Sequence, residues 1–197
     1  MTGKSTGLFA SVMAFAVYML TLCPTVYVEG SGELIGAVLG LGTPHPTGYP
    51  LFCLSGRLIS ALLPFAHPAY EINIASAFFA AAACGGLAWL LRERGVQAWV
   101  ALTSALLFAF SRTFWSQAVV AEVYGQALLL VVLVIAMALR ASERQYPRDV
   151  LLLGWLMGLG LTAHLMQVLI WPGVVVLLVW RCSGFIRQVR LVVQAIL

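Results

Sequence analysis

The sequence predicts an all-α, multi-pass transmembrane helical bundle. Of its 197 residues 62% are hydrophobic and only 9% are charged, and the mean hydropathy is +0.99. A soluble domain carries about 25% charged residues, so this chain cannot cover a water-facing surface. Eleven basic residues against seven acidic ones give a net charge of +4. Because the arginines cluster between apolar stretches, they indicate membrane topology, and no nucleic-acid partner is expected.

The first predicted span runs from Gly7 to Cys23 and ends before Pro24. It follows Lys4, and no small-x-small cleavage site comes after it, so we interpret it as an uncleaved membrane helix. Residues 24–68 then form the longest interruption of the apolar sequence. We expect this stretch to be the first extracytoplasmic loop.

Two short juxtamembrane helices are predicted inside this loop. The first covers 33–41, with Ser31 as N-cap and an apolar face made of Leu34, Ile35, Val38 and Leu41. TPHPTGYP, residues 43–50, cannot be regular helix because it contains three prolines. Pro50 and Pro64 confine the second helix, 51–63, to about 20 Å, which is short of the roughly 30 Å hydrocarbon core. We therefore expect both helices to lie along the membrane surface.

The rest of the chain supplies five further predicted passes and the start of a seventh span. The passes are Ala69–Leu91, Val96–Phe110, Val120–Leu139 and two shorter ones between Val150 and Trp180 that meet near Thr162–His164. The run from Leu191 to Leu197 stops in mid-helix. We expect residues 1–197 to be a single transmembrane module and the N-terminal part of a longer protein.

The arginine pattern supports this topology. If residues 51–63 do not cross the membrane, Lys4 and eight arginines fall on the cytoplasmic side, as the positive-inside rule requires. These arginines are Arg92, Arg94, Arg140, Arg144, Arg148, Arg181, Arg187 and Arg190. If 51–63 did cross, the loop with Arg92 and Arg94 would face outside.

The same topology gathers titratable groups on the extracytoplasmic side. They are Glu29, Glu33, His45, Arg57, Glu71, Arg112, Glu122 and His164, and their convergence is typical of a functional site. Each also has a simpler interpretation. Glu33 can be stabilised by a helix dipole, the arginines can reach lipid headgroups, and Tyr49, Trp115 and Tyr124 fit an interfacial aromatic belt.

Three sequence runs carry a family resemblance: SGELIGAVLGLGTPHPTGYPLF (31–52), FWSQAVVAEVY (114–124) and GLTAH (160–164). They resemble a membrane-protein family, long catalogued as a domain of unknown function, whose animal member is a protein O-mannosyltransferase. That family is similar to the GT-C glycosyltransferases. The family usually shows Asp-Ser-Gly-Glu in the first loop, whereas this chain has Gly30-Ser31-Gly32-Glu33. Glu33, His45 and Glu122 match the remaining family positions.

The resemblance implies transfer of a sugar, mannose-like, from a polyprenyl-phosphate donor to a hydroxyl of a protein or glycan acceptor. Such transfer needs a general base and cations near the donor phosphate. Glu33 or Glu29 is the candidate base, and Glu122, in a span-forming stretch, is expected to orient acceptor or loop. Candidate substrate-binding residues are His45, Tyr49, Arg57, Arg112 and His164.

Two other functions stay open from sequence. A transporter or flippase also collects charge in a membrane cavity, and Gly30 in the aspartate position is compatible with a degenerate, non-catalytic scaffold. No cofactor is expected, with a divalent metal ion left open, because the four cysteines are scattered without a CxxC pair. We expect a bacterial inner-membrane protein whose active face is extracytoplasmic.

Overall fold

The computed structural model describes residues 1–28, 30–63 and 67–181, and all regular structure in these residues is helical. The helices are α1 (Gly3–Leu20), α2 (Ser31–Gly40), α3 (Pro50–Leu62), α4 (Pro68–Glu93), α5 (Ala98–Ala109), α6 (Arg112–Ala118), α7 (Tyr124–Arg144), α8 (Pro147–Ala163), the 3-10 helix η1 (Leu165–Ile170) and α9 (Trp171–Arg181). The all-α prediction is confirmed. Glu29, Arg187, Arg190 and the predicted seventh span at 191–197 lie outside the described residues.

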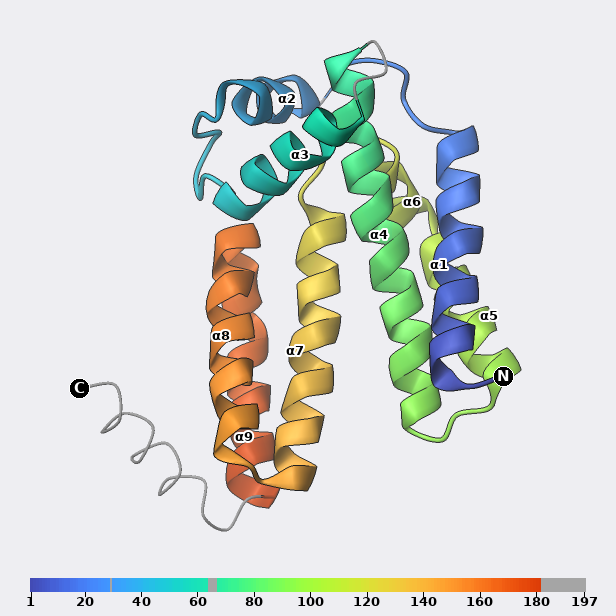
Figure 1. Cartoon of the computed structure of the whole chain (residues 1–197), viewed down its shortest axis with the longest axis vertical. Helices are drawn as coiled ribbons and strands as arrows, with labels where there is room; N and C mark the ends of the chain where they lie inside the picture. Colours follow the sequence, from blue (N-terminus) through green and yellow to red (C-terminus); the bar gives the residue numbers. More distant parts are fainter. Residues whose placement is uncertain (29, 64–66, 182–197) are drawn as a thin grey trace, which may run out of the picture.

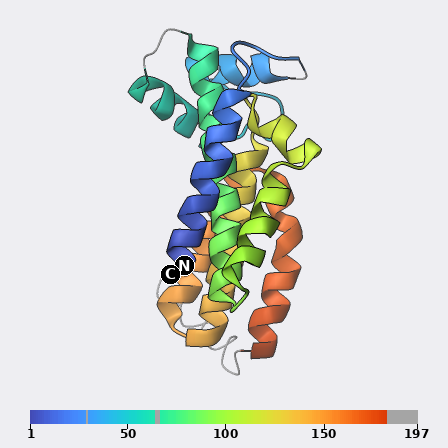
Figure 2. The same ribbon diagram turned by 90° about the vertical axis from the view of Figure 1, so that its right-hand side faces the viewer.

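The longer helices run side by side as a bundle, and α2 and α3 lie across one end of it (Figure 1). Figure 2 shows the same arrangement from the side, with α2 and α3 at that end only. We call this the α2–α3 end. The other end, where α4 and α7 finish at Glu93 and Arg144, is called the opposite end.

Proline sets the start of three helices. Pro50, Pro68 and Pro147 each occupy the first turn of α3, α4 or α8, where a missing N–H costs no hydrogen bond. Helix α3 therefore has 13 residues, as the sequence predicted, and is one of the apolar helices too short to be a candidate span.

Helix α4 forms the centre of the bundle and packs through small residues. A Cβ added to Gly85 would lie 2.5 Å from the carbonyl oxygen of Gly7 on α1. On its other side, a Cβ added to Gly125 of α7 would lie 2.9 Å from the backbone nitrogen of Ala80. Glycine at these positions lets three helix backbones approach closely, the usual packing of helices in membranes.

Three described helices, α1, α4 and α7, are long and apolar enough to cross a membrane, and the bent pair α5–α6 makes up to four. This supports an integral membrane protein. The two passes predicted between Val150 and Trp180 are α8, with 17 residues, and η1 with α9, and they do not reach that length. The total of six spans therefore stays a prediction, whereas the predicted break between the two is found at His164.

The predicted third span, Val96–Phe110, corresponds to α5, and after it the chain bends by 69° into α6. Two local expectations were wrong. The next helix begins at Tyr124 instead of Val120, so Glu122 lies in a connection and not within a helix. The N-cap of α2 is Gly30 instead of Ser31, because the Ser31 hydroxyl is turned back to the backbone of Tyr27.

Candidate functional site

Glu33 and His45 form a two-point contact at the α2–α3 end. The backbone N–H of His45 donates to Glu33 Oε1 at 2.5 Å, and His45 Nδ1 lies 3.0 Å from Oε2. The first turn of α2 carries Glu33, and the proline-rich loop brings His45 back to it. About half of each side chain is exposed. The hydrogen bond from the His45 ring, followed by the one from its backbone, lowers the pKa of Glu33, so the carboxylate is ionised at neutral pH.

Tyr49 extends this contact into the protein. Its hydroxyl lies 3.1 Å from His45 Nε2, so carboxylate, imidazole and phenol form a continuous chain. Tyr49 is only 7% exposed and has φ of 43°, a left-handed conformation that is unusual for an aromatic residue. Burial raises the pKa of Tyr49, with further increments from the nearby Tyr124, Glu122 and Glu33. Such strained, buried polar residues are more common at functional sites than elsewhere.

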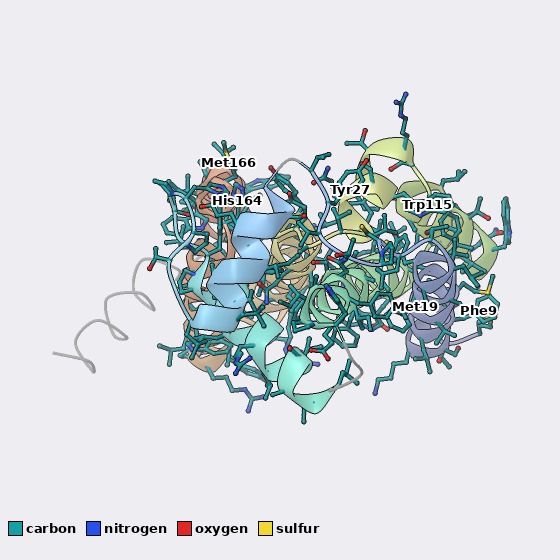
Figure 3. All side chains as sticks on the ribbon, turned by 90° about the horizontal axis from the view of Figure 1, so that it is seen from above. Phe9, Met19, Tyr27, Trp115, His164 and Met166 are labelled. Atoms are coloured by element: carbon teal, nitrogen blue, oxygen red, sulfur yellow. The ribbon has the colours of Figure 1, made fainter. Side chains whose placement is uncertain are left out.

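His164 lies between two tyrosine rings. Its ring centroid is 5.7 Å from that of Tyr49 and 5.7 Å from that of Tyr124. The break between α8 and η1 positions it, and its Nδ1 accepts the backbone N–H of Met166 at 3.1 Å. Seen from above, His164 and Met166 lie on the side where α2 is drawn, away from Trp115 (Figure 3). Tyr49, His164 and Tyr124 thus join α3, α8 and α7 at this end.

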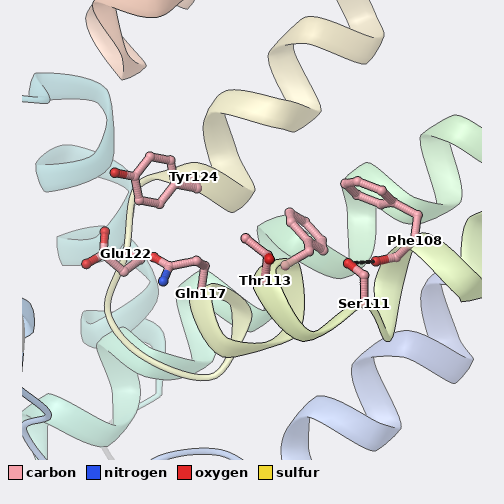
Figure 4. A pocket seen from close by; sticks show the side chains of 7 residues that line it. Phe108, Ser111, Thr113, Gln117, Glu122 and Tyr124 are labelled. Atoms are coloured by element: carbon pink, nitrogen blue, oxygen red, sulfur yellow. Dashed lines mark hydrogen bonds between the residues drawn. The ribbon is translucent and has the colours of Figure 1, made fainter.

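Glu122 lines a hollow of about 580 Å³. Figure 4 shows its carboxylate on the connection before α7, with Tyr124 beside it and Gln117 and Thr113 of α6 along the wall. The backbone of Glu122 is held from α4, because its N–H donates to Ser76 Oγ at 3.0 Å and the Ser76 hydroxyl donates back to its carbonyl at 3.2 Å. These two bonds stabilise a non-helical backbone where the sequence favours helix.

The hollow at Glu122 adjoins an apolar one. The second hollow measures about 300 Å³ and shares Phe108, Phe114 and Tyr124 with the first. It continues along α7 past Leu128 and Val131 and is also lined by His164, Met166 and Gln167. A hollow with several polar side chains therefore adjoins an almost wholly apolar one, an arrangement suited to a ligand with a polar head and an apolar tail.

The structure brings most of the predicted site residues together. Glu33, His45, Tyr49 and His164 are in sequential contact, and Tyr124 connects them to the hollow at Glu122. Arg112 is exposed, and it lies between Ser111 and Thr113, which line that hollow.

Other predicted residues are placed differently. Arg57 is exposed on α3 and lines neither of these two hollows. Glu71 is buried and accepts a hydrogen bond from Ser60 at 2.6 Å, which gives it a structural role between α3 and α4. Among the described residues no group of three His, Cys, Asp or Glu side chains could hold a metal ion.

Sequence reasoning underestimated Tyr124. It fits an aromatic belt, yet its ring packs on His164 and lines both hollows. The available signal was its position two residues after Glu122, inside the run FWSQAVVAEVY.

Comparisons with known proteins agree with the resemblance seen in the sequence. The chain is 39% identical over 146 residues to "Protein O-mannosyl-transferase TMEM260" of Mus musculus, covering 74% of this chain and 20% of that protein. It is 31% identical over 116 residues to "Protein O-mannosyl-transferase tmem260" of Dictyostelium discoideum, covering 55% of this chain and 14% of that protein. No solved structure gives a significant match. The chain spans a fifth or less of the length of these relatives. Residues 30–185 match the family model described as "Protein O-mannosyl-transferase TMEM260 N-terminal domain", and the chain belongs to that family.

Proposed function

We propose that this chain forms the N-terminal part of a membrane glycosyltransferase of GT-C type. It transfers a mannose-like sugar from a polyprenyl-phosphate donor to a serine or threonine hydroxyl of a protein. The printed names of the relatives support O-mannosyl transfer to protein. The observation that carries the proposal for this chain is the Glu33–His45–Tyr49 hydrogen-bonded chain, which reaches the hollow lined by Glu122 through His164 and Tyr124.

Glu33 acts as the general base in this proposal. Its carboxylate takes the proton of the acceptor hydroxyl while the acceptor oxygen bonds to the anomeric carbon of the sugar. The bond between that carbon and the phosphate oxygen breaks, and polyprenyl phosphate leaves. A base must be ionised before it reacts, and the contacts with His45 keep Glu33 in that state. Glu29, one position before Gly30, serves as a substitute base, and Glu122 orients acceptor or loop.

The donor occupies the joined hollows. Its isoprenoid tail lies among the apolar side chains beside α7, and its phosphate lies at the polar end near Glu122. Arg112 stands at the start of α6 next to two lining residues and supplies a guanidinium for the phosphate, a contact arginine makes in bidentate form. Arg57 is the second candidate for this contact.

The α2–α3 end faces the extracytoplasmic side in this proposal. At the opposite end α4 and α7 finish in basic residues, among them Arg92, Arg94, Arg140 and Arg144. The positive-inside rule places that end in the cytoplasm. Lipid-linked sugar and acceptor therefore meet outside the cytoplasm, and the bacterial inner membrane remains the predicted location.

One feature favours a different function. Gly30 occupies the position where the family pattern has aspartate, which suits a scaffold that has lost transfer activity. The two functions differ in a measurable way, because only the enzyme releases the sugar from its lipid donor in the presence of acceptor.

The test measures mannose transfer by the purified full-length protein, with polyprenyl-phosphate mannose as donor and a Ser/Thr peptide as acceptor. Glu33→Gln should reduce the rate by roughly 100-fold or more, since general bases contribute that much. Glu93→Gln, at the opposite end, is the matched control and should leave the rate unchanged. Arg112→Gln should weaken donor binding. Full activity in both Glu33→Gln and Glu29→Gln would refute the assignment, and no transfer by the unaltered protein would favour the scaffold.

A further inference from the structure

We propose that the opposite end of the bundle carries a binding site for an anionic phospholipid. A hollow of about 350 Å³ lies there between α4, α7 and α8. Its apolar wall is made of Trp89, Leu90, Leu133, Ala136, Met137 and Leu156, and its polar wall of Glu93, Arg94, Arg140, Glu143 and Arg144. We call it the arginine groove. None of the residues of the candidate glycosyltransferase site takes part in it.

The groove arises from the way α4 and α7 meet. The two helices touch at Gly125 against Ala80, and again at Gly86, where an added Cβ would lie 3.1 Å from a methyl group of Val132. After these contacts they diverge toward the opposite end (Figure 1). The lining residues of α7 begin directly after Val132, at Leu133. The groove therefore results from the divergence of α4 and α7 beyond their last close contact.

The length of the groove matches one membrane leaflet. The lining residues of α7 run from Leu133 to Arg144, eleven residues apart, which corresponds to roughly 16 Å of helix. Half of a hydrocarbon core is about 15 Å thick. Apolar side chains line the inner part, and the arginines are at the helix ends. One acyl chain fits the apolar part while its headgroup reaches the charged part.

The charges at the mouth favour an anionic headgroup. Glu143 is hydrogen-bonded to Arg94 and also lies in the field of Arg144 and Arg181, so three guanidinium groups surround one carboxylate. Arg140 contacts the buried Asp149, with 3.5 Å between Nε and Oδ1, and Glu93 is the remaining acid of the lining. Four arginines thus face three acids, and guanidinium donors remain for a phosphate, which arginine binds in bidentate form.

These features distinguish a lipid from a free anion. Inorganic phosphate would use only the arginines and leave the apolar part of the groove empty. A zwitterionic lipid would bring a cationic group next to the arginines, which like-charge repulsion disfavours. Basic pockets between membrane helices are a known way of holding anionic lipids. The combination of a leaflet-deep apolar wall and a basic mouth therefore fits phosphatidylglycerol or a similar lipid.

The experiment uses the full-length protein in nanodiscs of phosphatidylcholine with phosphatidylglycerol as a minor component. The protein is transferred to detergent, and the lipids it retains are identified by native mass spectrometry. We expect retained phosphatidylglycerol in preference to phosphatidylcholine. Arg144→Gln should reduce this retention about tenfold, since it removes charged hydrogen bonds to the phosphate. Ala136→Phe, which fills the apolar wall without changing any charge, should reduce it as well.

Arg148→Gln is the matched control. This arginine stands near the same end but lies over the Tyr146 ring at 5.1 Å and does not line the groove. It should retain lipid as the unaltered protein does, and thermal unfolding should show all three variants to be folded. Equal retention of both lipids, or equal losses in Arg144→Gln and Arg148→Gln, would overturn the proposal. Loss in Arg144→Gln with full retention in Ala136→Phe would show a headgroup or free-anion site instead.

Discussion

Both carboxylate oxygens of Glu33 are engaged by a single residue, His45. One oxygen receives the backbone N–H and the other lies 3.0 Å from the ring Nδ1. An ionised carboxylate only accepts hydrogen bonds, so Nδ1 carries the proton in this contact. In neutral His45 the other nitrogen, Nε2, then accepts the Tyr49 hydroxyl, 3.1 Å away. The contact with Glu33 thereby fixes which ring nitrogen of His45 carries the proton and which one faces Tyr49.

The Tyr49 hydroxyl is predicted to be a positioning group. Tyr49→Phe keeps the ring against His164 and removes the bond to His45 Nε2 together with a longer one, 3.4 Å, to the carbonyl oxygen of Pro46, so we expect a transfer rate about tenfold lower. Because His45 loses its partner at Nε2, the pH profile of kcat/KM should also shift. The control is Tyr27→Phe, whose ring is exposed. An unchanged pH profile in Tyr49→Phe would show that the hydroxyl has no part in positioning.

The contact between Glu33 and His45 should be lost only in acid. The pKa of Glu33 is lowered from its usual 4.5, so the contact stabilises the loop fully above pH 4.5 and disappears as the pH falls through the lowered value. NMR of the Glu33 side-chain carboxyl carbon should show this transition below pH 4.5. The transition should be missing in Glu33→Gln, and its onset above pH 4.5 would contradict the prediction.

Gly30→Asp should compensate for the loss of Glu29. Gly30 has φ of 99° and no atom within 4 Å of an added Cβ, so only the backbone opposes a side chain there. That conformation costs about 1–2 kcal/mol for an L-residue, and an aspartate N-cap is better than glycine by only about a few tenths of a kcal/mol, so the variant should be slightly less stable. We expect Glu29→Gln to lower transfer activity and the additional Gly30→Asp to raise it again. Gly36→Asp is the control, since Gly36 also has open space around it. If the additional Gly30→Asp did not restore transfer activity, an aspartate at position 30 would have no part in the reaction.

Helix packing can be tested at Gly85. A Cβ there would lie 1.8 Å from Ser11 Oγ and 2.5 Å from a backbone oxygen of α1, so Gly85→Ala should destabilise the protein by about 1–3 kcal/mol. Gly158→Ala is the matched change on α8, where no atom of the described residues lies within 4 Å of an added Cβ, and it should be neutral or stabilising. The measurement is the melting temperature of both variants in the same detergent, which should be lower for Gly85→Ala. Equal melting temperatures would mean that α1 and α4 are not in close contact.

The proposed orientation depends on which side Arg94 occupies. In a background without the native cysteines, Arg94→Cys should react with a membrane-permeant maleimide and resist an impermeant one added from outside. A cysteine replacing Thr47, at the α2–α3 end, should react with both reagents. Labelling of position 94 from outside would show that the opposite end of the bundle faces the extracytoplasmic side.

Local rules predicted the extent of the short helices α2 and α3 well. Prolines 50 and 64 limited the length of α3, and Leu34, Ile35 and Val38 of α2 are buried as their spacing indicated. Leu41 was expected on the same face but is 59% exposed, because the helix ends at Gly40 and Leu41 adopts a left-handed conformation. Helix ends depend on the path of the following loop, which hydrophobic spacing does not report.

The remaining differences have a long-range origin. The sequence around Glu122 favours helix, and the hydroxyl that holds it in another conformation belongs to Ser76, 46 residues earlier. Motif spacing suggested that Glu33 and His45 belong to one site. It could not show that Tyr49 and His164, 115 positions apart, would stack, since only the packing of α3 against α8 brings them together.

The stacking of His164 between Tyr49 and Tyr124 sets an order for biosynthesis. A chain is made from its N-terminus, so the acidic loop at Glu33 leaves the ribosome long before the turn that carries His164. Until α8 and the turn after it have been made, Tyr49 lacks the ring it packs against, and the hollow beside α7 lacks the wall made by His164 and Met166. A nascent chain that ends before this turn therefore has the loop with Glu33 but lacks one wall of the hollow beside α7. The series of contacts from Glu33 to Tyr124 is complete only after this turn has been made.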